Sequence, residues 1–152
     1  MTDPISFATT SPRLALPYLF SGQAQKEVYV NEAFSLLDGV THCAVEAESN
    51  SPAASPADGQ AWLIGSSPTS DWSGKAGHLA LRQAGQWLYV VPRDGMRVLN
   101  RATGQDVRRV AGTWRAVAAP AAASGGTVVD VEARSALATL IARLRDAGIF
   151  PA

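Results

Sequence analysis

The sequence has few of the residues from which metal sites and nucleophilic sites are built. Its 152 residues include one cysteine, Cys43, and two histidines, His42 and His78. A single cysteine excludes an intrachain disulfide. A metal site needs three or four ligands at a suitable spacing, and no such pattern is recognisable. A cysteine–histidine nucleophile pair stays open, but nothing marks it, so we interpret these residues as structural and expect no metal and no cofactor.

An excess of one charge and a long hydrophobic run are also missing. Thirteen basic and thirteen acidic residues give a formal net charge of zero, whereas a generic nucleic-acid binder has a basic excess. No apolar stretch approaches the ~20 residues that span a bilayer, and the start of the chain lacks the pattern of a signal peptide. Eleven of the thirteen cations are arginine, a bias typical of a GC-rich bacterial genome. We therefore expect synthesis in a bacterial cytosol, with neither nucleic acid nor membrane as partner.

The motifs of the common enzyme classes are absent. Gly74 and Lys75 form a Gly-Lys pair, but Thr69 and Ala76 occupy the places where a phosphate-binding loop needs Gly and Ser or Thr. Neither Gly-x-Gly-x-x-Gly nor Gly-x-Ser-x-Gly occurs. Four aspartates beside turn-forming neighbours leave a small polysaccharide hydrolase as one alternative, although aspartate commonly caps turns; they are Asp58, Asp71, Asp94 and Asp106. We expect a protein that is not an enzyme.

Composition divides the chain into helical, β-rich and linking parts, which together predict an α+β fold. The proline-bearing start is typical of an extended arm, and two proline- or glycine-rich stretches are typical of linkers. The region between the linkers predicts a small antiparallel β-sheet or barrel-like module rich in Trp. The expected parts are an arm at 1–20, a helix at 21–45, a linker at 46–59, the β module at 60–117, a linker at 118–129 and an amphipathic C-terminal helix at 130–150.

The arm and the first helix both carry apolar residues that need a partner. In the arm Leu14, Leu16, Tyr18 and Phe20 alternate with period two. The helix, for which Ser21 is the predicted N-cap, is apolar over more than half of its circumference. Its main apolar face contains Tyr29, Ala33, Leu36, Leu37 and Val40, opposite Glu27, Asn31, Ser35 and Asp38. Either the rest of the chain or a neighbouring subunit has to cover these groups.

The β module contains all four tryptophans, three of them directly after a glycine-containing turn. Its expected strands are 61–64, 78–82, 86–91, 96–100, 106–110 and 113–117, with turns at "QAGQ", "PRDG" and "VAGT". Trp62, Trp87 and Trp114 lie in strands and are expected in a core. Trp72 lies in the loop "SSPTSDWSGKAG". We predict that Trp72 is exposed, which makes it the candidate contact for a glycan.

Arginines gather on the later predicted strands. The segment "VRRV" at 107–110, together with Arg97, Arg101 and Arg115, forms a local cationic cluster. The simplest interpretation is a solvated strand face. The functional interpretation is contact with an acidic partner surface or an anionic glycan.

The C-terminal helix has the clearest boundaries in the sequence. Asp130 is a good N-cap, and Gly148 followed by Ile149 matches a left-handed C-cap. A narrow apolar stripe contains Ala133, Leu137, Leu140, Ile141 and Leu144. The stripe is shorter than three heptads, which is short for a free-standing coiled coil. A symmetric oligomer in which arms and helices cross between subunits would cover it.

The run from Leu16 to Ala33, within "LALPYLFSGQAQKEVYVNEAFSLLDGV", resembles a domain family of phage fibre and spike proteins and alphaproteobacterial gene transfer agents. A weaker tryptophan-rich pattern extends the resemblance to about residue 115. The ending "VVDVEARSALATLIARLRDAGIF" is similar to the terminal helix of phage fibre and tail-associated proteins. The resemblance implies a virion component, most specifically the small base of a head spike. It implies no catalytic residues.

These observations together predict a homo-oligomeric structural adaptor that joins a capsid protein to a host-binding fibre protein. Neither threefold nor fivefold symmetry is favoured. The alternative is a carbohydrate-binding module of a phage tail fibre, and the second alternative is the hydrolase. The expected subunit or partner interface comprises Leu14, Leu16, Tyr18, Phe20, Gln23, Gln25, Lys26, Asn31, Leu137, Leu140 and Leu144. The polar members are expected to bond either to their own chain or across a subunit boundary.

Overall fold

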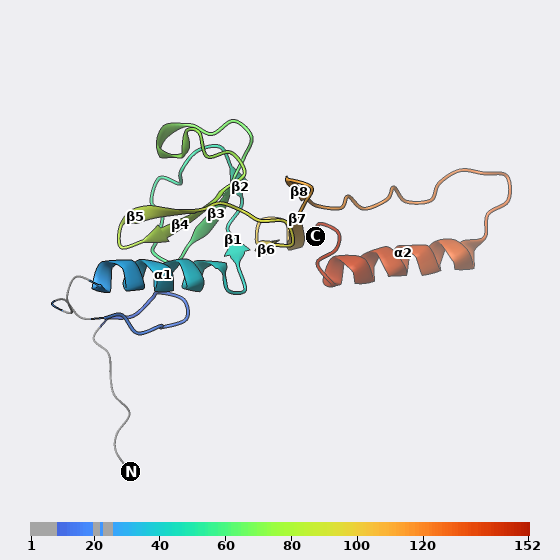
Figure 1. Ribbon diagram of the computed structural model, residues 1–152. Coiled ribbons are helices and arrows are strands. Elements are labelled where there is room, and N and C mark those ends of the chain that lie inside the picture. The colour runs from blue at the N-terminus through green and yellow to red at the C-terminus, as the bar shows by residue number, and fades with distance from the viewer. Residues whose placement is uncertain (1–8, 20–21, 23–25) are drawn as a thin grey trace, which may run out of the picture. The chain divides into compact units, whose positions relative to one another are not determined.

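The protein is α+β, and its described residues form two α-helices and two small mixed sheets of four strands each. The computed structural model describes residues 9–19, 22 and 26–152. The chain forms two compact units, each with one sheet. The first unit holds the described residues up to Cys43 together with Glu48–Pro92, and the second holds Ala44–Ala47 and Arg93–Ala152. Figure 1 labels the elements along the chain.

The first unit is built on the sheet order β2-β3-β4-β5. Its elements are α1 (Glu27–Val40), β2 (Glu48–Ser49), β3 (Ala61–Ile64), the 3-10 helix η1 (Ser70–Trp72), β4 (Leu79–Gln83) and β5 (Gln86–Val90). Strand β2 runs parallel to β3, and the other pairs are antiparallel. All four residues of β3 are buried, because both faces of the sheet are covered. Helix α1 covers one face, and the loop that contains η1 covers the other (Figure 1).

Three tryptophans form the core on the loop side of this sheet. The rings of Trp72 and Trp87 lie 5.3 Å apart, and those of Trp62 and Trp87 lie 5.6 Å apart, both pairs edge to face. Trp72 is 0% exposed. The prediction that Trp72 is exposed is therefore wrong. Its backbone N–H donates to the carbonyl of Thr69, and its indole packs against both strand tryptophans.

Helix α1 packs against β4 at one close approach. A Cβ at Gly39 would overlap the side chain of Leu81, so the backbone of the helix lies directly on the sheet there. The helix begins at Glu27, later than the predicted start, and Gly22, the predicted first helical residue, has φ of 95° and is not helical. Lys26 is the N-cap, and the predicted cap Ser21 lies outside the described residues.

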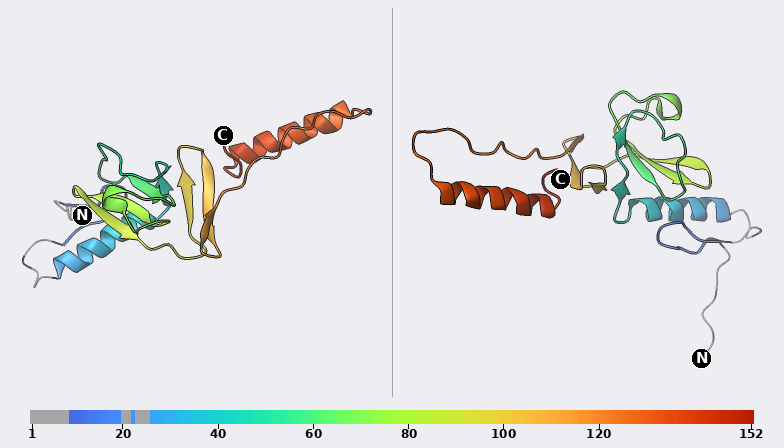
Figure 2. Two further views of the ribbon diagram at one scale, coloured as in Figure 1. Left: turned by 90° about the horizontal axis from the view of Figure 1, so that it is seen from above. Right: turned by 180° about the vertical axis from the view of Figure 1, so that it is seen from behind.

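The second unit has the sheet order β1-β6-β7-β8. Its elements are β1 (Ala44–Val45), β6 (Arg97–Asn100), β7 (Gln105–Val110), β8 (Thr113–Arg115) and α2 (Val131–Asp146). Strand β1 runs parallel to β6, and the other pairs are antiparallel. The buried amide of Gln105 donates to the carbonyls of Val117 and Ile149, which ties the sheet to the chain on both sides of α2. Figure 2 shows the extended segment that precedes α2 running back alongside that helix.

The predicted strands agree with the observed ones to within a residue or two, but two expectations about their connections are wrong. The turns at Ala84–Gly85 and Ala111–Gly112 join hairpins, as expected, with both residues of each turn at positive φ. The "PRDG" turn joins β5 to β6, which belong to different sheets, so it closes no hairpin. The expected linker 46–59 contains β2, and each sheet has one parallel edge strand, so the β region is not one antiparallel module.

We predict that Trp72 is the largest single contributor to the core of the first unit. Trp72→Ala lowers the free energy of unfolding by about 3–5 kcal/mol, because it removes a fully enclosed indole and leaves a cavity. Urea denaturation followed by circular dichroism measures this loss. Trp114→Ala, at a half-buried site in the second unit, is the control and is expected to cost less. Equal losses in the two variants would contradict the packing described.

Candidate functional site

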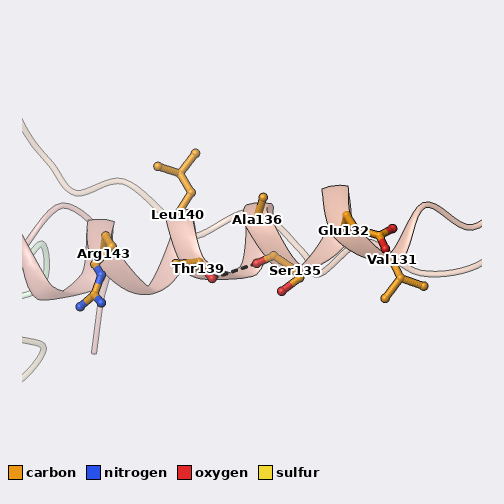
Figure 3. Close-up of a pocket in the computed structure, with 7 residues that line it drawn as sticks. All are labelled: Val131, Glu132, Ser135, Ala136, Thr139, Leu140 and Arg143. Carbon is orange, nitrogen blue, oxygen red and sulfur yellow. Dashed lines mark hydrogen bonds between the residues drawn. The ribbon is translucent and has the colours of Figure 1, made fainter.

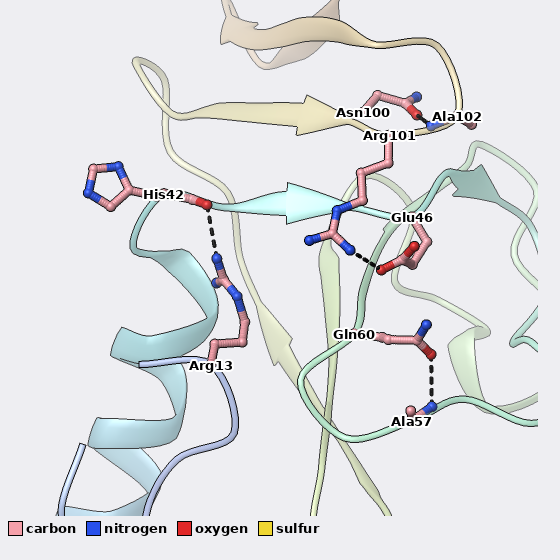
Figure 4. Close-up of polar contacts among 8 residues, drawn as sticks. All are labelled: Arg13, His42, Glu46, Ala57, Gln60, Asn100, Arg101 and Ala102. Carbon is pink, nitrogen blue, oxygen red and sulfur yellow. Dashed lines mark hydrogen bonds and ion pairs between the residues drawn. The ribbon is translucent and has the colours of Figure 1, made fainter. Parts of the chain in front are cut away.

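The polar face of α1 binds the N-terminal arm. The carboxylate of Asp38, which is 2% exposed, accepts backbone N–H groups of Leu14 at 2.6 Å and Arg13 at 3.1 Å. The guanidinium of Arg13 donates to the carbonyls of Asp38 and Gly39 and, at 3.0 Å, of His42 (Figure 4). The arm residues 9–19 contain only one isolated β-bridge, Thr10 to Pro17. Side chains of α1 therefore satisfy much of the arm's backbone.

Asn31 holds the arm in a similar way about two turns earlier along the helix. Its amide accepts the N–H of Leu19 at 2.8 Å and donates to the carbonyl of Leu19 at 3.1 Å. The hydroxyl groups of Tyr18 and Ser35 lie 2.6 Å apart, and Gln83 of β4 donates to the same Tyr18 oxygen. Asn31 thus joins the helix to the arm of its own chain.

The predicted interface residues fall into three groups. One group is half-buried and comprises Leu16, Tyr18 and Asn31. Tyr18 and Asn31 make the hydrogen bonds given above. Leu14 is 43% exposed, Lys26 is exposed, and Leu144 is half-buried. Phe20, Gln23 and Gln25 lie outside the described residues. Among the described residues, Tyr18 and Asn31 therefore connect the arm to α1, and Leu137, Leu140 and Leu144 lie together on α2.

The apolar face predicted for the first helix is largely exposed. Tyr29 is 78% exposed, Leu37 is 50% exposed and Ala33 is exposed, whereas Leu36 and Val40 are half-buried. The buried residues of α1 are Ser35, Asp38 and Gly39. The reversal follows from the arm, whose backbone groups need the polar side chains. The sequence predicts that Asn31 is bonded but does not predict the burial of Ser35 and Asp38, although the spacing of the three residues on one side of the helix is the available signal.

Helix α2 has no buried residue, and its apolar stripe borders a groove. Leu137 is 51% exposed and Leu140 54%, while Ile141 and Leu144 are half-buried. The groove has a volume of 700 Å³, and the segment 120–123 forms its other side. Figure 3 shows another side of α2, where seven exposed residues from Val131 to Arg143 border an open depression.

The ends of α2 are well defined, as predicted. The Asp130 carboxylate accepts the N–H of Ala133 at 2.8 Å, and Gly148 has φ of 70°. Arg143 and Arg145 lie in the last turn, where cations are favourable. The helix is therefore stabilised at its ends, while its apolar stripe is left to solvent.

The described residues contain no group of three or more side chains placed to hold a metal ion. Cys43 is 5% exposed and His42 is exposed, so the two neighbours face different surroundings. Burial raises the pKa of the Cys43 thiol and outweighs the opposing effect of the Arg13 charge. Burial, with a smaller contribution from Asp71, also raises the pKa of Tyr89.

None of the described helices is long and apolar enough to cross a membrane.

Two aspartates considered for a hydrolytic pair cap turns. Asp58 accepts the N–H of Gly85, and Asp94 accepts the N–H of Gly112, each at the tip of a hairpin. These bonds stabilise the β4–β5 and β7–β8 turns, which is the structural role expected of aspartate beside glycine.

We predict that Asp38 holds the arm in place. Asp38→Ala leaves two backbone N–H groups without an acceptor and costs about 1–3 kcal/mol. Hydrogen exchange at the amide of Leu14 should become much faster. Glu32→Ala, at an exposed position of the same helix, is the control and should leave that amide unchanged. Continued protection of Leu14 in the Asp38 variant would show that the arm is held by other contacts.

We predict that Cys43 is inert in the folded protein and weakens it at high pH. A raised pKa in the folded state means that the folded thiol keeps its proton to higher pH than the unfolded one. The contribution of the protonated Cys43 thiol to the free energy of unfolding is complete at pH values below the ordinary pKa of 9.0. It is lost as pH rises through the folded pKa. Unfolding free energy should therefore fall above that pH, and less steeply in Cys43→Ala. Rapid alkylation of the native thiol at neutral pH would contradict this.

Comparison with known proteins identifies the family of the chain and no characterised relative. No curated protein matches the sequence. A family model described as "Protein of unknown function (DUF2793)" matches residues 30–115. The match begins in α1, runs through both sheets and ends with β8. The match covers more than half of the chain, and the protein belongs to the DUF2793 family.

Proposed function

We propose that the protein is an oligomeric structural adaptor whose C-terminal helices associate with those of other copies. The observation that carries this is the exposed apolar stripe of α2, with Leu137 51% and Leu140 54% exposed on a helix that buries no residue. A helix of 16 residues is marginal in water on its own, and apolar packing normally supplies its stability. A second copy of the same stripe is the partner whose shape and spacing match it.

The resemblance of residues 16–33 to phage and gene transfer agent proteins supports a finer form of this proposal. In that form the oligomer is the base of a head spike, which docks on the capsid of a virion-like particle and attaches a host-binding fibre. The exposed apolar face of α1, which includes Tyr29 and Leu37, is a second surface available for a capsid or fibre protein.

The carbohydrate-binding alternative required an exposed Trp72, and the structure buries that residue. Trp72 is enclosed by Trp62 and Trp87, so neither of its faces is free to stack on a sugar. The hydrolase alternative keeps no favoured pair, because Asp58 and Asp94 cap separate hairpins. No particular observation favours either alternative over the adaptor.

Substitution of the α2 stripe tests the oligomer. The double variant Leu137→Asp, Leu140→Asp places two charges in the predicted interface and removes about 1.5–3 kcal/mol of burial per leucine. Native mass spectrometry should show an oligomer for the natural chain and a monomer for the variant. Ala142→Asp, on the opposite side of the helix, is the control and should leave the oligomer intact.

A natural chain that stays monomeric at micromolar concentration would overturn the proposal. If the oligomer forms, its subunit number identifies the symmetry. Electron microscopy of particles assembled with and without the protein then tests the head-spike position. Particles that carry complete spikes without the protein would contradict the finer form alone.

A further inference from the structure

Strand register in the second unit places three arginines side by side on one face of the sheet. Arg97 of β6 lies directly opposite Arg108 of β7, and Arg108 lies directly opposite Arg115 of β8. All three side chains are exposed, while their neighbours Val98, Val107 and Trp114 are buried or half-buried on the other face. Residues directly opposite one another have Cβ atoms about 4.5–5.5 Å apart. We refer to Arg97, Arg108 and Arg115 as the arginine row.

The charge of the arginine row is not neutralised within the part of the chain that the structure describes. The ion pairs found there join Arg101 to Glu46 (Figure 4) and Arg143 to Asp146, and neither includes the row. Asp106 lies on the same face, yet it is opposite Leu99 and forms no ion pair. Like charges directly opposite one another destabilise a sheet. A row of three therefore has a cost in folding that bound anions would remove.

The chemistry of the row favours carboxylate or phosphate groups. A guanidinium group binds a carboxylate or phosphate through two parallel hydrogen bonds. Leu99 and Val110, which are 40% and 37% exposed, flank the row on the same face. A depression of 250 Å³, lined by Arg97 and Arg108 and also by Arg109 and Asp94, adds some depth to the surface.

The same face lacks the features of a nucleic-acid or glycan platform. Proteins that bind single-stranded nucleic acid stack the bases on aromatic side chains. None of the outward residues of β6, β7 and β8 is aromatic; they are Arg97, Leu99, Asp106, Arg108, Val110, Thr113 and Arg115. A polypeptide can offer carboxylates to the arginine row and aliphatic side chains to Leu99 and Val110 at the same time.

We propose that the arginine row binds an acidic segment of another polypeptide. Each guanidinium takes a carboxylate of that segment, and Leu99 and Val110 contact its aliphatic side chains. The inference goes beyond the adaptor function and does not depend on α2 or on oligomer formation.

Fluorescence anisotropy of a labelled peptide in which Glu alternates with Ala provides the test. Arg108→Gln removes the central guanidinium and should weaken binding about tenfold, the effect of one charge-assisted pair. Arg93→Gln removes the same charge from an exposed turn outside the row and should change affinity by less than about twofold. The peptide with Gln in place of Glu should not bind.

The melting temperature separates loss of binding from loss of folding. Arg108→Gln should melt at the same or a higher temperature, since it relieves repulsion from both neighbouring arginines. Arg97→Gln, at the end of the row, serves as a second variant if the first does not fold. The proposal is overturned by failure of the acidic peptide to bind, by equal losses in the Arg93 and Arg108 variants, or by tighter binding of a uronate polysaccharide or an oligonucleotide.

Discussion

The hydrogen bonds between the arm and helix α1 determine which side of that helix remains available to other molecules. The arm has too few strand-like bonds to satisfy its own backbone. Buried or half-buried polar side chains of α1 supply the missing partners, above all Asp38 and Asn31. Leaving a buried N–H without an acceptor costs about 1–3 kcal/mol, comparable to the gain from burying one apolar side chain, and the polar side of α1 accepts three such groups, those of Arg13, Leu14 and Leu19. The helix therefore turns its polar side inward and leaves Tyr29 in solvent.

Both units present surfaces for association, but of different kinds. In the first unit, the surface proposed for association is the exposed apolar face of α1. In the second unit it comprises the stripe of α2 and the arginine row. The apolar stripes contribute by burial, which is non-directional, whereas the arginines contribute directional bonds whose strength depends on salt. Under the two proposals made above, one partner would bind through the helices and another through the sheet.

The tryptophan core explains why the first unit can keep such a surface exposed. Trp62, Trp72 and Trp87 interlock edge to face on one side of the sheet, and α1 approaches the other side through Gly39. Large aromatic rings bury much area per residue, so a small unit obtains a core from few side chains. The apolar face of α1 is then not needed for the stability of the unit.

The sequence by itself determined the local elements of this protein. Alternation and glycine turns located the longer strands, and Asp130 and Gly148 located the ends of α2, because these signals depend on neighbours within a few residues. Only the tertiary structure decided which face of α1 is buried, where Trp72 lies and which strands share a sheet. Two-residue strands such as β1 and β2 have no periodicity to detect, and the enclosure of Trp72 depends on contacts between distant segments. The arginine row likewise exists only through strand register, which the order of residues alone does not specify.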